Sequence, residues 1–284
     1  MAKYNSDIIM GRVVLNVNDL NKQLNFYTGT LGMTIISRDE KSADLGTEDG
    51  KALLTLNKVE SSWIRSYGLY HVAYLVPTKE DLANILRHFV VSKTILDGAA
   101  DHGYSNAIYL QDAENNGIEV YYDLDESTWD KREDGKIVGV TEPLDGDGLL
   151  AISSELSPYK LPIGTTVGHV HLSVQNAKVS SEFYQNILNF SDKFSVPTGS
   201  WLAHGDYHHH LAVNNWAGSS LNLRKEGTPG LAYFDILVES VETYNKLVEN
   251  IIENNVRVIE QTAEKIKILD PNLIEVHLHL ISKK

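Results

Sequence analysis

RVVLNVNDLNKQLNFYTGTLGM at residues 12–33 aligns without a gap on HVHLSVQNAKVSSEFYQNILNF at residues 169–190. The apolar positions of the two stretches coincide, including the Phe26-Tyr27 pair on Phe183-Tyr184. Each stretch begins with alternating apolar residues, which predicts a strand, and continues with a helical pattern. The chain therefore contains an internal repeat that begins with a strand and a helix.

A second repeat lies between these stretches and after them. GLYHVAYLV at 68–76 aligns on GLAYFDILV at 230–238, and a helical pattern follows each. Short strands come next, ending in GIEVYYD at 117–123 and LIEVHLH at 273–279. These patterns predict four strand–helix–strands modules, which we number in chain order: module 1 (1–66), module 2 (67–124), module 3 (165–228) and module 4 (229–284). Modules 1 and 3 are one subtype, and modules 2 and 4 the other.

The stretch 125–164 breaks the repeat. It is rich in Asp, Glu and Gly, so we expect a connector between the two halves of the chain. Two ordinary α+β domains with accidental similarity remain the alternative to four modules. The gapless match of residues 12–33 favours the modules.

Composition limits the classes of function. The formal net charge is -13, which argues against nucleic acid or an anionic membrane as a partner. No long apolar run predicts a membrane span, and the N-terminus does not resemble a secretory signal. Cysteine is absent, so a metal would need imidazole and carboxylate ligands, and eleven histidines are present. We expect a cytoplasmic protein.

Four βαβββ modules with a FYxxxL-like helix resemble the vicinal-oxygen-chelate superfamily, which includes glyoxalase I, bleomycin-resistance proteins and extradiol dioxygenases. The resemblance covers nearly all of the chain outside the connector. It implies an α+β fold in which the modules pair into two cupped, incomplete β-barrels. It also implies metal ligands that project inward from equivalent strands, although the fold alone does not specify a reaction.

The ligand positions of this superfamily are on the first and last strands of the modules. On the first strands these positions hold Arg12, His71, His169 and Tyr233, and on the last strands Glu119 and Glu275. If modules 2 and 3 pair, the ligands are His71, His169 and Glu119, the two-histidine-one-carboxylate set that suits Fe(II).

Other pairings of the modules give less suitable sets of metal ligands. Modules 3 and 4 would use Tyr233, a poor ligand because its pKa near 10 keeps it neutral. Modules 1 and 2 would place Arg12 opposite His71 and Glu119. We therefore favour modules 2 and 3 as the metal-binding barrel and modules 1 and 4 as its partner. Glu275 leaves a second site open, and His171 is the reserve ligand if the strand register differs.

The segment from His102 to Glu119 resembles the extradiol dioxygenase signature, in which a His precedes an apolar–Tyr pair and an Asp leads to the ligand Glu. His102, Tyr109 and Asp112 stand at the matching positions, while Ala113 replaces the family's Pro. The resemblance implies that Tyr109 and His102 hydrogen-bond the substrate.

A second segment, GDYHHHLAVNNW at 205–216, resembles the strand that carries the distal catalytic histidine of extradiol enzymes. The alignment places His209 at that position, as a general acid–base group. A surface tract that sequesters metal is the alternative for a His triplet. Three nearby aromatic residues could line the pocket or belong to the core: Trp201, Tyr207 and Trp216.

Together these resemblances, closest to Bacillus-type catechol 2,3-dioxygenases, imply a ring-cleaving dioxygenase that uses Fe(II), or Mn(II), with a small aromatic diol and O₂. A homodimer is possible. The alternatives are a glyoxalase-type lyase, for which only Glu226 could supply a fourth ligand, and a metal-free small-molecule binding protein. The sequence does not separate catechol from hydroquinone substrates.

Overall fold

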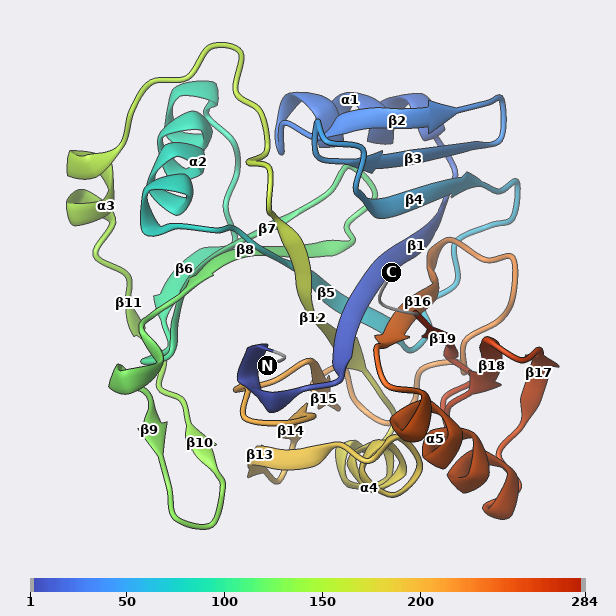
Figure 1. Ribbon diagram of the computed structural model, residues 1–284. Helices are drawn as coiled ribbons and strands as arrows, with labels where there is room; N and C mark the ends of the chain where they lie inside the picture. The colour runs from blue at the N-terminus through green and yellow to red at the C-terminus, as the bar shows by residue number, and fades with distance from the viewer. Residues whose placement is uncertain (1–2, 282–284) are drawn as a thin grey trace.

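The computed structural model describes residues 3–281, and each repeated unit contains one strand, one helix and three further strands (Figure 1). A short 3-10 helix (Lys3–Asn5) precedes the first unit. The first unit comprises β1 (Ile8–Val17), α1 (Leu20–Gly29), β2 (Thr34–Arg38), β3 (Ser42–Gly46) and β4 (Ala52–Lys58). The second comprises β5 (Gly68–Leu75), α2 (Lys79–Ser92), β6 (Gly98–Asp101), β7 (Ser105–Gln111) and β8 (Gly117–Asp123).

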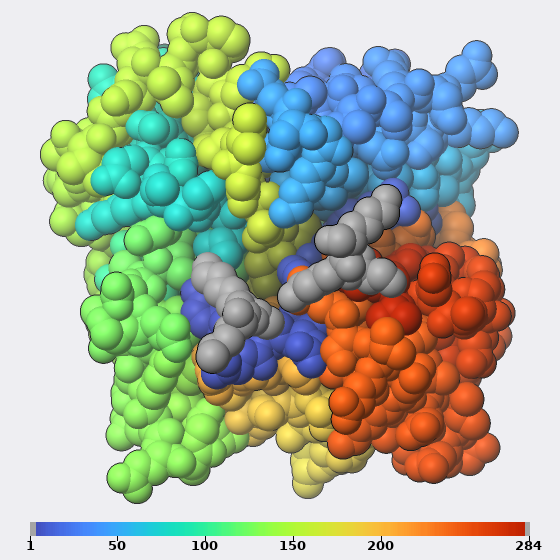
Figure 2. All heavy atoms as spheres, in the orientation of Figure 1, coloured from blue at the N-terminus to red at the C-terminus, as the bar shows by residue number. Residues whose placement is uncertain are grey.

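The second half of the chain repeats this order. Its first unit comprises β12 (Thr166–Ser173), α4 (Ala177–Leu188), β13 (Ser191–Val196), β14 (Gly199–Ala203) and β15 (Leu211–Asn214). Its second comprises β16 (Gly230–Val238), α5 (Val241–Glu253), β17 (Val258–Gln261), β18 (Lys265–Leu269) and β19 (Glu275–Leu280). In the space-filling view the first unit (blue) lies at the upper right and the fourth (orange to red) at the lower right, with the third (yellow) beside it at the bottom (Figure 2).

Two curled, open sheets contain these strands. The eight-stranded sheet has the order β17-β18-β19-β16-β1-β4-β3-β2, so it joins the first and fourth units through the antiparallel pair β1 and β16. The nine-stranded sheet has the order β11-β6-β7-β8-β5-β12-β15-β14-β13, so it joins the second and third units through β5 and β12. The predicted fold class, α+β modules paired into two cupped, incomplete barrels, is confirmed.

A repeated tyrosine contact links α1 to the second unit and α4 to the fourth. Tyr27 and Tyr184, the equivalent tyrosines of α1 and α4, are fully buried. The Tyr27 hydroxyl donates to Asp112 (3.0 Å), and the Tyr184 hydroxyl donates to Asp270 (3.1 Å). Asp112 also accepts hydrogen bonds from the backbone amides of the turn before β8. The repeat therefore holds in place the turn that leads into the strand of Glu119.

The segment between the halves is folded. It contains a 3-10 helix (Glu126–Thr128), β9 (Asp130–Lys131), β10 (Ile137–Val138), β11 (Glu142–Pro143) and α3 (Gly146–Ile152). The strand β11 extends the nine-stranded sheet beside β6, and α3 packs against α2 (Figure 1). Within residues 3–281, every helix is too short or too polar to cross a membrane.

Candidate metal centre

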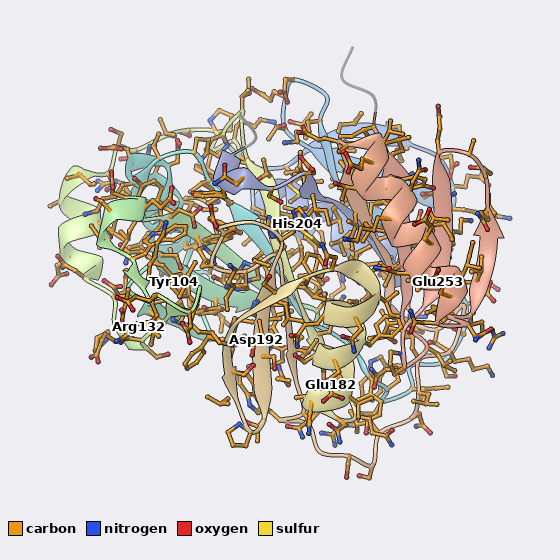
Figure 3. All side chains as sticks on the ribbon, turned by 60° about the horizontal axis from the view of Figure 1, so that its bottom comes forward. Tyr104, Arg132, Glu182, Asp192, His204 and Glu253 are labelled. Atoms are coloured by element: carbon orange, nitrogen blue, oxygen red, sulfur yellow. The ribbon has the colours of Figure 1, made fainter. Side chains whose placement is uncertain are left out.

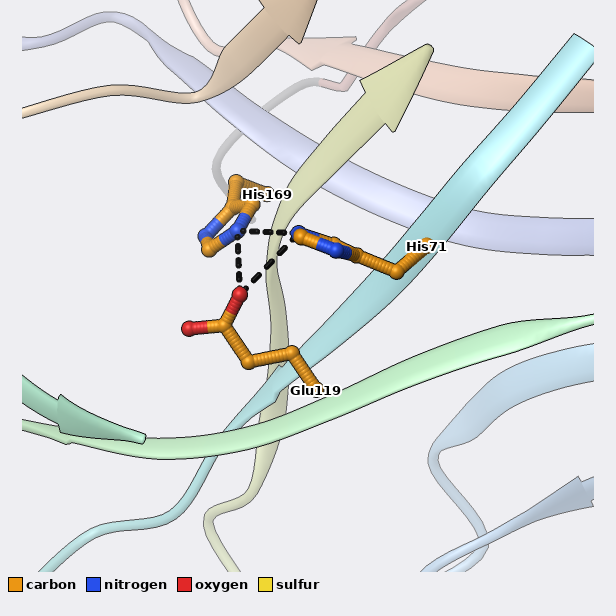
Figure 4. Close-up of side chains that lie close together, drawn as sticks. All are labelled: His71, Glu119 and His169. Carbon is orange, nitrogen blue, oxygen red and sulfur yellow. Dashed lines mark hydrogen bonds and ion pairs between the residues drawn. The ribbon is translucent and has the colours of Figure 1, made fainter. Parts of the chain in front are cut away.

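Three side chains from the middle of the nine-stranded sheet meet at one point (Figure 4). His71 is on β5, Glu119 on β8 and His169 on β12, and all three are buried. Glu119 Oε2 lies 3.0 Å from His71 Nε2 and 3.2 Å from His169 Nε2, and the two imidazole nitrogens are 3.2 Å apart. These are the three residues for which the sequence analysis expected a ligand role.

The strand register explains the convergence. On the central strand β5, Ala73 pairs with Glu119 of β8 and with His169 of β12. Side chains two apart on a strand share a face, so His71 projects on the same side as Ala73. The small side chain of Ala73 leaves the space in which the three functional groups meet.

Burial sets the protonation of these groups. Burial alone would raise the pKa of Glu119, but its interactions with His169 and His71 hold that pKa well below its ordinary value. Burial lowers the pKa of His169 to about 4. At neutral pH the site therefore presents a carboxylate and an imidazole lone pair.

This donor set fits a divalent cation. Bonds of about 2.1 Å at right angles place neighbouring ligand atoms about 3.0 Å apart. The observed separations of 3.0 to 3.2 Å match one face of such an octahedron. When both Nε2 atoms carry lone pairs, three acceptors converge, and a cation can satisfy all of them. Two histidines and one carboxylate on one face are the ligand set of non-haem Fe(II) sites.

The three groups lie in a cavity of about 790 Å³. Trp201 and Trp216 contribute to its walls, as does Tyr70. The residues 139–141 of the segment between the halves also line it. The cavity therefore combines polar groups at its base with aromatic walls, which is typical of a site for a small aromatic molecule.

His102 and Tyr109 line the same cavity. Tyr109 pairs with Glu119 across β7 and β8. The imidazole of His102 lies between two oxygens, with Nδ1 2.8 Å from the Val140 carbonyl and Nε2 2.7 Å from the Tyr109 hydroxyl. A carbonyl only accepts, so Nδ1 carries the proton and the Tyr109 hydroxyl donates to Nε2 of the neutral ring.

His209 also lines the cavity, with its ring centroid 4.1 Å from that of His169. Its Nδ1 is 2.7 Å from Nδ1 of His208, whose Nε2 is 2.8 Å from Asp123 Oδ1. Because the carboxylate accepts, His208 Nε2 donates to it and His208 Nδ1 accepts the proton of His209 Nδ1. His209 Nε2 therefore keeps its lone pair, and burial lowers the pKa of this imidazole.

Asp123 and His208 were not among the expected site residues. Asp123 ends β8, and His208 stacks on Tyr104 with centroids 4.3 Å apart. The His triplet lies outside the strands, between β14 and β15, so strand alternation does not indicate the contact of His208 with His209. The partnership with Asp123, 85 residues earlier, has no signal in the sequence.

The remaining candidates lie elsewhere or have other partners. His171 lines the cavity, but its Nε2 is 2.9 Å from the Asn214 amide. Tyr207 is buried in a separate cluster with Tyr104 and Trp129, and its hydroxyl donates to Asp123. Glu275 is in the eight-stranded sheet, and Glu226 is exposed outside the strands.

The chain resembles known proteins in sequence and in fold. Residues 9–120 match the family described as the glyoxalase/bleomycin resistance protein/dioxygenase superfamily. The chain is 31% identical to catechol-2,3-dioxygenase of Bacillus subtilis over 277 residues, 95% of this chain and 96% of the relative. In fold it resembles a candidate dioxygenase of Bacillus subtilis (TM-score 0.65, 11% identity, 95% and 84% of the two chains). It also resembles glyoxalase I of Zea mays (TM-score 0.58, 17% identity, 96% and 92%).

Proposed function

The chain belongs to the glyoxalase/bleomycin resistance protein/dioxygenase superfamily, and on that premise we propose that it is an extradiol dioxygenase acting on catechol- or hydroquinone-type rings. The main support for this proposal is the convergence of His71, His169 and Glu119 in a cavity that His209 also lines. The Bacillus subtilis relative, named for cleavage of catechol, supports the same reaction class.

His71, His169 and Glu119 would hold Fe(II), or Mn(II) as the alternative. Bound there, the cation would supply open coordination positions for the diol and O₂ and would pass electrons from the diol to O₂. Glu119 is the one carboxylate among the three ligands, so it neutralises only part of the charge of a divalent ion. The site consequently favours a diol that binds as an anion.

His209 would take the proton that the diol loses. Its Nδ1–H is engaged by His208, so the free lone pair is on Nε2, at the cavity wall. The low pKa of the buried imidazole keeps it unprotonated before the substrate binds. Asp123 and His208 hold the ring in the tautomer that a general base requires.

Tyr109 and His102 would orient the second oxygen of the diol. The Tyr109 hydroxyl donates to His102, so its oxygen can accept a hydrogen bond from the substrate. The aromatic side chains of Trp201 and Trp216 line the cavity and would contact the flat ring of the diol.

A lyase of the glyoxalase type is less well supported. Such enzymes resemble this one in fold but take a fourth protein ligand, for which Glu226 was the one candidate. Glu226 is exposed and outside the strands. Among the described residues, the cluster around His71 contains three ligating groups. A metal-free binding protein would not require this converging set.

The test is O₂ consumption by protein loaded anaerobically with Fe(II), measured with catechol, 3-methylcatechol and hydroquinone, and with Mn(II) in parallel. We expect one O₂ consumed per diol, and loss of both iron and activity in His71→Ala. His88→Ala on α2, outside the cavity, is the matched control and should retain both. Iron-loaded protein that consumes no O₂ with any of the three diols would refute the proposal.

A further inference from the structure

A second group of ligating side chains lies in the eight-stranded sheet. Asp235 is on β16, and His277 and His279 are on the neighbouring parallel strand β19. Asp235 Oδ1 lies 3.5 Å from His277 Nδ1 and 3.0 Å from His279 Nε2. All three ligand atoms are within 4.8 Å of one another.

This group is not the repeated copy of the first one. The repeat aligns His71 with Tyr233 and Glu119 with Glu275. Asp235 and His277 each stand two residues farther along their strands, and they pair directly in the sheet register. The second group therefore uses positions that hold no ligand in the nine-stranded sheet.

Other side chains orient the second group. The Glu275 carboxylate is 2.6 Å from His277 Nε2, and the Tyr233 ring stacks on the same imidazole with centroids 3.8 Å apart. Arg12 Nε donates to the other oxygen of Asp235 at 3.2 Å. Metal-binding histidines usually donate their second ring nitrogen to a carboxylate in this way.

The hydrogen bond to Glu275 determines which nitrogen of His277 is free. In the neutral ring, Nε2 carries the proton for Glu275, and the lone pair of Nδ1 faces Asp235 Oδ1. Two acceptors that face each other repel, unless a second proton on the ring or a bound cation lies between them. A tetrahedral ion with bonds of about 2.05 Å separates its ligand atoms by about 3.3 Å, between the two observed distances.

Charge and access also favour a cation. Asp235 and Asp44 form ion pairs with the guanidinium of Arg12, and Glu275 contacts His277. Asp235 and His277 are buried, whereas the His279 side chain is 28% exposed. An ion can therefore reach the site from solvent and be held by buried ligands.

We propose that Asp235, His277 and His279 form a second binding site for a late first-row divalent cation of the Zn(II) type. Imidazole ligands suit such ions. The bound ion would cross-link β16 and β19, independently of the reaction in the other sheet.

The probe is Zn(II), added to metal-stripped full-length protein in equilibrium dialysis with elemental analysis. We expect two equivalents for the unaltered chain, and one equivalent each for His71→Ala and His279→Ala. The double variant should bind none. Glu275→Gln should weaken the second equivalent by about 10- to 100-fold. The control Glu253→Gln, on the exposed face of α5, should bind two (Figure 3).

Two results would overturn the proposal. One is a single equivalent in the unaltered chain that His71→Ala abolishes. The other is a second equivalent that persists in His279→Ala, which would place the ion at other histidines. If circular dichroism shows that His279→Ala does not fold, Glu275→Gln serves as the test instead. An unchanged affinity of that variant for the second Zn(II) also overturns the proposal.

Discussion

Asp123→Asn tests whether the hydrogen-bonded chain behind His209 prepares it as a base. Asp123 accepts from His208 Nε2 (2.8 Å) and from the hydroxyls of Tyr207 and Tyr4 (3.2 Å each). The asparagine side chain removes the charge and can donate to His208, which reverses the order of protons along the chain. His209 Nε2 would then carry a proton and could not act as a base.

The magnitude follows from the bond that is lost. A hydrogen bond to a charged group contributes about 1.5–3 kcal/mol. At about 1.4 kcal/mol per tenfold change, kcat should fall by about 10- to 150-fold. The assay is steady-state O₂ consumption with catechol, together with iron content and the pH profile of kcat. Iron content should not change, because Asp123 is not a ligand.

The matched control is Asp206→Asn, an exposed carboxylate two residues before His208. Its kcat should stay within about twofold of the unaltered chain, because exposed substitutions have small effects. A fully iron-loaded Asp123→Asn protein with the kcat of the unaltered chain would refute the reasoning. Loss of iron in that variant would instead assign Asp123 a purely structural role.

Two further predictions concern stability, measured by urea unfolding of the metal-free chain. Gly117→Ala places a Cβ 2.0 Å from the Tyr70 carbonyl oxygen and should lower the free energy of unfolding by about 1–3 kcal/mol. The control Gly98→Ala, whose Cβ meets nothing within 4 Å, should lower it by less than about 1 kcal/mol. Equal losses in the two variants would contradict the close approach of the strands. Burial lowers the pKa of His210 to about 3, so between pH 7 and 5 the unfolded chain gains a proton that the native chain does not. The free energy of unfolding should therefore fall by about 2 kcal/mol more in the unaltered chain than in His210→Asn. The asparagine keeps an acceptor for the His204 amide. Parallel pH profiles for the two proteins would contradict a neutral, buried His210.

The internal repeat made the fold predictable. Strand alternation and the helix pattern of residues 12–33 recur at 169–190, so the strands and helices could be recognised twice. The convergence of His71, Glu119 and His169 could be expected because equivalent strands of paired units bring equivalent positions together. That step relied on family resemblance, since alternation alone does not indicate which units pair.

Long-range side-chain partners could not be predicted. Asp123 looked like the end of a strand, and only the folded sheet brings it to His208. The segment 125–164 lacked the repeat, yet its Val140 carbonyl determines the tautomer of His102. His277 and His279 do not stand at the family's ligand position, which Glu275 occupies, so the resemblance gives them no role.

The most direct test of the central claim is the mass of the product formed from catechol under isotopically labelled O₂. We predict a ring-opened product that carries both labelled atoms, formed by the iron-loaded chain. Glu119→Gln should form none, and Glu182→Gln, exposed on α4, should form the normal amount (Figure 3). A product with one labelled atom or none, or undiminished product from Glu119→Gln, would contradict it.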